Sequence, residues 1–141
     1  MRAKQRGVNL IELMVVIGIL SIIAAIAFPA FTSQVLKSNR MDAKRMLMQI
    51  QSAYERYYNE NSNAYPTLAS ITAVYTALSL GTPPASSFYT FTAPTTTTTS
   101  YTLSASVTGN QVADTTCTNF YLDYLGGQTS TNNAAASTSC W

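Results

Sequence analysis

An uncharged apolar run near the N-terminus limits what this chain can fold into more than any other feature. Between Glu12 and Lys37 lie 24 residues without a charged side chain, LMVVIGILSIIAAIAFPAFTSQVL. As a helix they would extend about 36 Å at 1.5 Å per residue, which is long enough to cross a bilayer. The run is apolar on all sides rather than along one stripe, so such a helix must be surrounded by lipid or by other protein.

A secretory signal peptide is one interpretation of this N-terminus, because Arg2, Lys4 and Arg6 precede the apolar run. Three features oppose it. Glu12 interrupts the start of the run, no A-x-A-like cleavage site follows it at the expected place, and Pro29 leads into a long amphipathic continuation. Basic residues on the two sides of the run nearly balance, so the positive-inside rule assigns no topology.

The first 31 residues, MRAKQRG followed by VNLIELMVVIGILSIIAAIAFPAF, resemble the leader and N-terminal signature of type IV prepilins. The matching features are a basic leader ending in Gly7, a glutamate five residues later at Glu12, the apolar run and Pro29. This resemblance implies cleavage after Gly7 by a prepilin peptidase, N-methylation of the new amine on Val8, and assembly of the helix into a filament core. The family usually has Phe where Val8 stands and Thr where Asn9 stands.

The resemblance continues beyond the N-terminus. The segments LKSNRMDAKRMLMQIQSAYERYYNENSNAY and TTTSYTLSASVTGNQVADTTCTNFYLDYLG and the final CW are similar to PilE-type minor pilins of type IVa pili. The expected fold is therefore the α+β type IV pilin fold, a long N-terminal helix packed on an antiparallel sheet with a C-terminal disulfide-bounded region. We expect a cleaved leader at 1–7, a membrane or filament-core helix at 8–36 and a globular domain at 37–141.

The rest of the composition argues against an enzyme. The chain has 141 residues, enough for one domain, and contains no histidine, two cysteines and six Asp or Glu residues. It has no imidazole base, and its scattered carboxylates and two cysteines form no convincing zinc, iron or paired-carboxylate site. We expect no catalytic residue, no metal and no cofactor.

Positive charge is confined to the N-terminal part of the chain, because no Lys or Arg follows Arg56. The net charge is only +2, and a cluster of cations at 37–45 is the one feature that invites a DNA-binding interpretation. The alternative, which we favour, is that these are solvated or groove-facing charges that meet lipid headgroups or neighbouring subunits. The cluster comprises Lys37, Arg40, Lys44 and Arg45.

After Pro29 the pattern becomes amphipathic. Apolar residues spaced by 7, 4, 3, 4 and 3 positions line one helix face: Leu36, Ala43, Leu47, Ile50, Tyr54 and Tyr57. We expect one helix from about residue 8 to 60, with Pro29 permitting a kink. Four residues should end it, namely Asn59, Asn61, Asn63 and Pro66.

A connecting region follows, with a short turn of helix expected within 68–80. Three β-type runs come next, at Ser87–Thr92, Thr99–Val107 and Thr118–Tyr124. In the second run apolar residues alternate with Thr and Ser, which is typical of a sheet with one buried face. The tract Thr95–Thr99 is expected to form a polar hairpin loop.

Cys117 and Cys140 are the only cysteines. They are either two buried free thiols or, as an oxidising periplasm favours, a disulfide bond. The bond would fix the tail STNNAAASTS, which has little apolar material of its own. Closing this loop of about 24 residues would contribute about 3.4 kcal/mol in the chain-entropy treatment.

Glu12 is the only charged residue between Arg6 and Lys37. A carboxylate beside an apolar helix is costly to desolvate unless a fixed positive group meets it. Cleavage after Gly7 would create such a group, the α-amine of Val8. We predict that Glu12 meets the amine of the previously added subunit and sets the axial register. The alternative is a carboxylate that only marks the membrane boundary.

These observations together favour a structural subunit of a type IV pilus, most similar to minor pilins, with roles in adhesion, twitching motility or DNA uptake through the fibre. The expected partners are other major and minor pilins, the prepilin peptidase and methyltransferase, the inner-membrane assembly machinery, and the inner membrane before assembly. We expect the C-terminal domain in the periplasm before assembly and the chain in an extracellular pilus afterwards. A major pilin, a type II secretion pseudopilin and a single-span anchored binding protein stay open as alternatives.

Overall fold

The computed structural model describes residues 9–83, 88–132, 135–137 and 140–141, and of residues 135–137 the backbone alone. Gly7 and Val8 lie outside the described residues. The chain divides into two compact units, one ending at Val35 and one from Leu36 to Trp141.

One helix contributes to both units. Helix α1 spans Leu10–Glu60, 51 residues, and contains Pro29. In the C-terminal unit its buried residues are Ala43, Leu47, Ile50, Ala53 and Tyr54. These follow the predicted face, so the helix and its spacing are confirmed. The helix ends in a turn in which Ser62 and Asn63 have positive φ angles of 56° and 57°, a conformation that Asn tolerates better than most residues.

A second, short helix packs beside the sheet. Helix α2 spans Ile71–Ala77, within the range expected from the sequence. The Ser70 side chain accepts a hydrogen bond from the Ala73 N–H at 3.1 Å, which satisfies one free donor of the first turn. Helix α2 contacts the first strand of the sheet.

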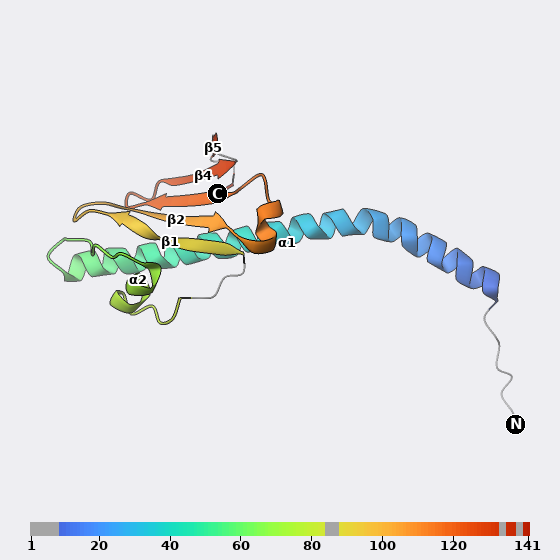
Figure 1. Ribbon diagram of the computed structural model, residues 1–141, viewed down its shortest axis with the longest axis horizontal. Helices are drawn as coiled ribbons and strands as arrows, with labels where there is room; N and C mark the ends of the chain where they lie inside the picture. Colours follow the sequence, from blue (N-terminus) through green and yellow to red (C-terminus); the bar gives the residue numbers. More distant parts are fainter. Residues whose placement is uncertain (1–8, 84–87, 133–134, 138–139) are drawn as a thin grey trace, which may run out of the picture. The chain divides into compact units, whose positions relative to one another are not determined.

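The sheet has five antiparallel strands in sequence order, with the C-terminal half of α1 along one face (Figure 1). Its strands are β1 Tyr89–Thr96, β2 Tyr101–Val107, β3 Asn119–Asp123, β4 Gln128–Asn132 and β5 Ala135–Ser137. A 3₁₀ helix, η1, spans Gly109–Ala113 between β2 and β3. Helix and sheet share one hydrophobic core, whose largest fully buried side chains include Tyr54, Tyr101, Phe120 and Leu103.

Two differences from the expected strands have physical reasons. Thr95 and Thr96 belong to β1 rather than to the hairpin loop; Pro94 is tolerated because β1 is an edge strand and its register shifts between Thr92 and Thr95. Ser87, the expected first residue of that strand, lies outside the described residues. Strands β4 and β5 were not expected, because the sequence after Leu125 lacks the apolar alternation that marks a half-buried strand.

Candidate assembly site on the N-terminal helix

The N-terminal unit exposes apolar side chains around the whole helix. Of the described residues, only α1 is long and apolar enough to cross a membrane, with a mean hydropathy of 2.7 over its most apolar window. Its large apolar side chains from Leu10 to Val35 are between 39% and 74% exposed. An apolar surface of this extent needs a cover of lipid or protein.

Glu12 lies in the first turn of α1. A carboxylate there interacts favourably with the positive end of the helix dipole. Asn9 precedes the helix: its carbonyl accepts from Leu13 N–H at 3.2 Å, and its side-chain oxygen accepts from Ile11 N–H at 3.4 Å. Asn is a favourable N-cap residue, so the helix retains an N-cap although the family usually has Thr at this position.

The two residues assigned to assembly do not lie together. Pro29 is 17 residues after Glu12 in the same helix, or about 25 Å along its axis. Near Pro29 the hydroxyl of Thr32 donates to the Pro29 carbonyl at 2.9 Å, and Ser33 donates to the Ala30 carbonyl at 2.9 Å. These local bonds satisfy hydroxyl groups on a surface that is otherwise apolar.

A buried polar network holds η1 against the first turns of α1 in the C-terminal unit. Arg40 Nε donates to Asp114 at 2.5 Å and its Nη2 to the other carboxylate oxygen at 2.6 Å. Burial raises the pKa of Asp114, but hydrogen bonds from Arg40 and from the Cys117 N–H outweigh it and hold that pKa below its ordinary value. Arg40 is therefore not one of the solvated charges expected from the sequence.

Gln111 completes this network and is fully buried. Its Nε2 donates to the Leu36 carbonyl at 3.2 Å and to the Tyr89 hydroxyl at 3.1 Å, while its oxygen accepts from Asn39 at 2.9 Å. Neither Gln111 nor Asp114 was singled out as a network residue from the sequence. Both are separated from their α1 partners by more than 70 residues, so no local pattern could have indicated the contact.

The C-terminal end of the chain is fixed by a disulfide bond and by aromatic packing. Cys117 and Cys140 form the predicted bond. Trp141 packs edge-on against Phe120 at 5.6 Å and donates its indole N–H to the Thr129 carbonyl at 2.7 Å. The Lys44 ammonium lies 5.7 and 5.8 Å from these two ring centres, within cation–π range. Burial and the nearby Arg40 charge lower the pKa of Lys44.

Comparisons with known proteins agree with these features. Residues 2–28 match the prokaryotic N-terminal methylation motif, and residues 29–121 match the family described as type IV minor pilin ComP, DNA uptake sequence receptor. The chain is 41% identical over 56 residues to the fimbrial protein EcpC of Eikenella corrodens, covering 40% of this chain and 37% of that protein. It is 39% identical over 57 residues to the type IV major pilin protein PilA of Myxococcus xanthus, covering 40% and 26%.

A solved structure extends the similarity over most of the fold. A type IV pilin from Shewanella oneidensis superposes with a TM-score of 0.52 at 27% identity, covering 75% of this chain and 97% of that one. The chain is thus a type IV pilin. It belongs to the ComP family of type IV minor pilins. This is a family of structural pilins. The matching stretch spans between a quarter and two fifths of the curated relatives' lengths.

Proposed function

We propose that this chain is a minor pilin that helps to prime or build a type IV pilus, whose fibre serves adhesion, twitching motility or DNA uptake. The observation that carries the proposal is the helix of the N-terminal unit, whose apolar side chains are exposed on every side. Support also comes from the match of residues 2–28 to the prokaryotic N-terminal methylation motif. In the inner membrane lipid covers this surface, and in the fibre the same helices of other subunits replace the lipid.

The residues of the leader boundary would act in sequence. A prepilin peptidase cuts after Gly7, and the exposed amine of Val8 is then methylated and keeps its positive charge. Glu12 of an incoming subunit meets the amine of the subunit added before it, in a core with little water where attraction between charges is strong. Pro29 removes one backbone donor and allows the helix to bend as it packs. The domains proposed are the leader at 1–7, the core helix at 8–36 and the globular part at 37–141.

The test is to shear surface fibres from cells and to analyse them by mass spectrometry. We expect the chain in the fibres, beginning at Val8, at low copy relative to the major pilin. High copy would instead identify a major pilin, recovery in a secretion complex would identify a pseudopilin, and recovery in the membrane alone would identify an anchored binding protein.

Direct DNA binding is a second candidate, favoured by the description of the matched family as a DNA uptake sequence receptor. Neutralisation of phosphates by Lys and Arg supplies most non-specific affinity for DNA. In this chain the cations are confined to positions before residue 57. Arg40 pairs with the buried Asp114, and Arg45 pairs with Asp42 at 3.0 Å. DNA would therefore contact α1 rather than the sheet.

A salt titration separates direct binding from uptake through the fibre. The full chain in detergent is titrated with labelled duplex DNA at several salt concentrations, alongside Lys37→Gln and Arg45→Gln. A direct receptor binds at physiological salt and loses affinity in both variants. We expect weak binding that disappears as salt is raised, because few accessible cations are available.

A further inference from the structure

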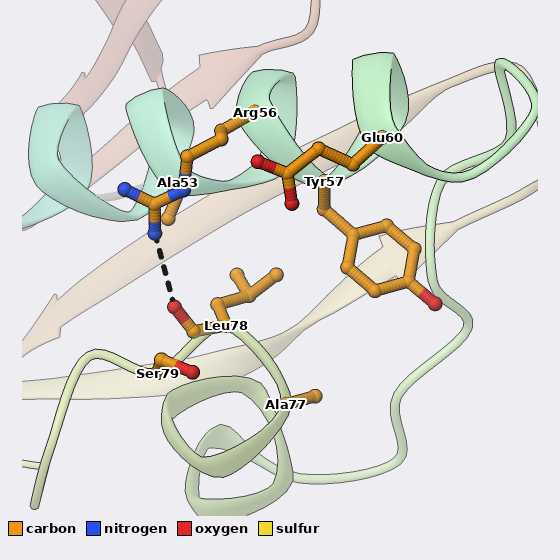
Figure 2. A pocket seen from close by; sticks show the side chains of 7 residues that line it. All are labelled: Ala53, Arg56, Tyr57, Glu60, Ala77, Leu78 and Ser79. Carbon is orange, nitrogen blue, oxygen red and sulfur yellow. Dashed lines mark hydrogen bonds between the residues drawn. The ribbon is translucent and has the colours of Figure 1, made fainter.

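Most cations of the C-terminal unit are held by other groups of the same chain. Arg40 forms the buried pair with Asp114, and Arg45 forms an exposed ion pair within α1. The Arg56 guanidinium donates to the Leu78 carbonyl at 3.2 Å, where it lines a small pocket at the end of α2 (Figure 2). These three side chains therefore have partners before any ligand arrives.

The other cations of this unit, Lys37 and Lys44, form no ion pair among the described residues. Lys37 is exposed on α1. The Lys44 ammonium lies over the rings of Phe120 and Trp141, and burial together with the Arg40 charge lowers its pKa. A negatively charged ligand would stabilise the charged form of this ammonium group, because an opposite charge offsets both effects.

A methionine separates the two lysines on one side of α1. Positions 37, 41 and 44 follow each other by four and three residues, which places their side chains on one face of a helix. We call Lys37, Met41 and Lys44 the lysine stripe. Met41 is 69% exposed, and beside it lies an open groove of about 330 Å³, lined by Met41, Lys44, Arg45 and Met48. The stripe thus combines positive charge with an accessible apolar side chain.

The lysine stripe begins where the apolar run ends, because Lys37 directly follows that run in the sequence. A helical run of about 36 Å in a hydrocarbon core of about 30 Å brings Lys37 to the level of the lipid headgroups. Lys44 lies about 10 Å further along α1. Helical side chains lean towards the N-terminus, and the potential of an anionic surface acts over a Debye length of about 8 to 10 Å. Both ammonium groups can therefore interact with such a surface.

We infer that the lysine stripe docks on anionic phospholipid headgroups on the periplasmic side of the inner membrane; the inference rests on the membrane stage of the proposed function. Lys37 and Lys44 face the lipid phosphates, and Met41 packs against the apolar part of the headgroup region. Trp141, beside Lys44, is a residue type that favours the membrane interface. Duplex DNA presents its phosphates without an adjoining apolar layer, so the mixed composition of the stripe favours lipid. The contact gives the globular domain a preferred orientation on the membrane before assembly.

Fluorescence quenching at position 41 tests this contact. The full-length Met41→Cys chain, whose native cysteines are bonded to each other, is labelled with a fluorophore and reconstituted into vesicles of phosphatidylcholine, alone or mixed with phosphatidylglycerol. Both preparations contain the same small fraction of phosphatidylcholine that carries a nitroxide quencher on its headgroup. We expect several-fold stronger quenching with phosphatidylglycerol. Ser52→Cys is the position control, because it is exposed on the same side of α1 about 16 Å further along.

Two charge variants of the labelled chain show whether the stripe is responsible for the quenching. Lys37→Gln should reduce the additional quenching that phosphatidylglycerol produces, and high salt should reduce it as well, because salt screens the attraction between exposed charges. Arg56→Gln also removes one positive charge, but from a side chain outside the stripe, so it should leave the quenching unchanged. Both side chains are exposed in the folded chain.

The outcomes separate the inference from the proposed function. Equal quenching in the two lipid mixtures, or an increase that Lys37→Gln and high salt both leave intact, overturns the docking. Duplex DNA that floats with chain-bearing phosphatidylcholine vesicles at physiological salt, but not with Lys37→Gln vesicles, assigns the stripe to nucleic acid and also overturns the docking. Absence of the chain from sheared fibres overturns the proposed function, whatever the quenching, whereas failed docking leaves a chain that still enters fibres.

Discussion

At the scale of single residues, Asp114 links α1 to η1 in the C-terminal unit, because it is 2% exposed and accepts hydrogen bonds from Arg40, Gln111 and two backbone N–H groups. Asp114→Asn leaves the Arg40 charge without its partner, so we expect a loss of about 3 kcal/mol in the free energy of unfolding. The fluorescence of Trp141, the only tryptophan, reports unfolding of the full chain in detergent.

The matched control is Asp42→Asn. Asp42 pairs with Arg45, but the two side chains are 60% and 78% exposed, so this change should cost less than about 1 kcal/mol. Equal effects of the two substitutions would show that the buried network contributes nothing beyond an ordinary surface pair.

The same carboxylate predicts how stability depends on pH. The pKa of Asp114 in the folded chain lies below its ordinary value of 3.8, so the unfolded state takes up a proton first as the pH falls. The contribution of the group is therefore complete above about pH 4 and is lost as the pH falls through the lowered pKa. Acid unfolding of Asp114→Asn should lack this component, whereas an unchanged acid transition would contradict the assignment.

At the scale of elements, the disulfide bond holds the C-terminal strands to the body of the sheet. Strands β4 and β5 are five and three residues long, and β4 buries only the small Ser130 side chain. Cys140→Ser should therefore lower the free energy of unfolding by about 3 kcal/mol, the loop-closure contribution for a sequence separation of 23. Thermal melts with and without reductant measure it; identical melting temperatures would argue against this role.

The same strands show where sequence reasoning stops. The buried face of α1 and strand β2 were predictable from the sequence. Leu47, Ile50 and Tyr54 keep a helical spacing, and apolar and polar residues alternate from Tyr101 to Val107, so the local periodicity indicates which side chains are buried. Strand β4 has the sequence QTSTN and pairs through its backbone with β3. Its side chains carry no periodic apolar signal, so only tertiary contact specifies it. The Arg40–Asp114 pair was missed for the same reason.

At the scale of the whole molecule, we expect export and assembly to depend on the leader boundary. The prepilin peptidase is expected to need a residue without a side chain before the scissile bond. Gly7→Leu should therefore leave uncleaved precursor in the inner membrane and remove the chain from fibres. Immunoblotting of membrane fractions resolves the two forms, with Asn9→Thr, which restores the residue usual in the family, as a control that should be processed. Normal cleavage of Gly7→Leu would refute the assigned site.

Entry into the fibre is the step in which Glu12 should matter. Within one chain the amine of Val8 would lie one turn from Glu12, so a pair inside a single subunit could form in the membrane as well as in the fibre. A pair between subunits forms only when the incoming helix reaches one axial position. In a core without water the attraction falls steeply with misplacement, so such a pair would select that position. Removing the carboxylate removes the selection but not the apolar surface that inserts.

Glu12→Val should therefore insert into the membrane as well as or better than the unaltered chain, because a charge at the membrane is costly. Its recovery in sheared pili should fall, measured at matched membrane levels. Glu12→Asp is a second useful variant, because it keeps the negative charge but has a shorter side chain. Its recovery in sheared pili should lie between that of Glu12→Val and that of the unaltered chain. If a carboxylate at this position only marks the membrane boundary, all three forms will be recovered equally, and the axial register must then come from the globular unit.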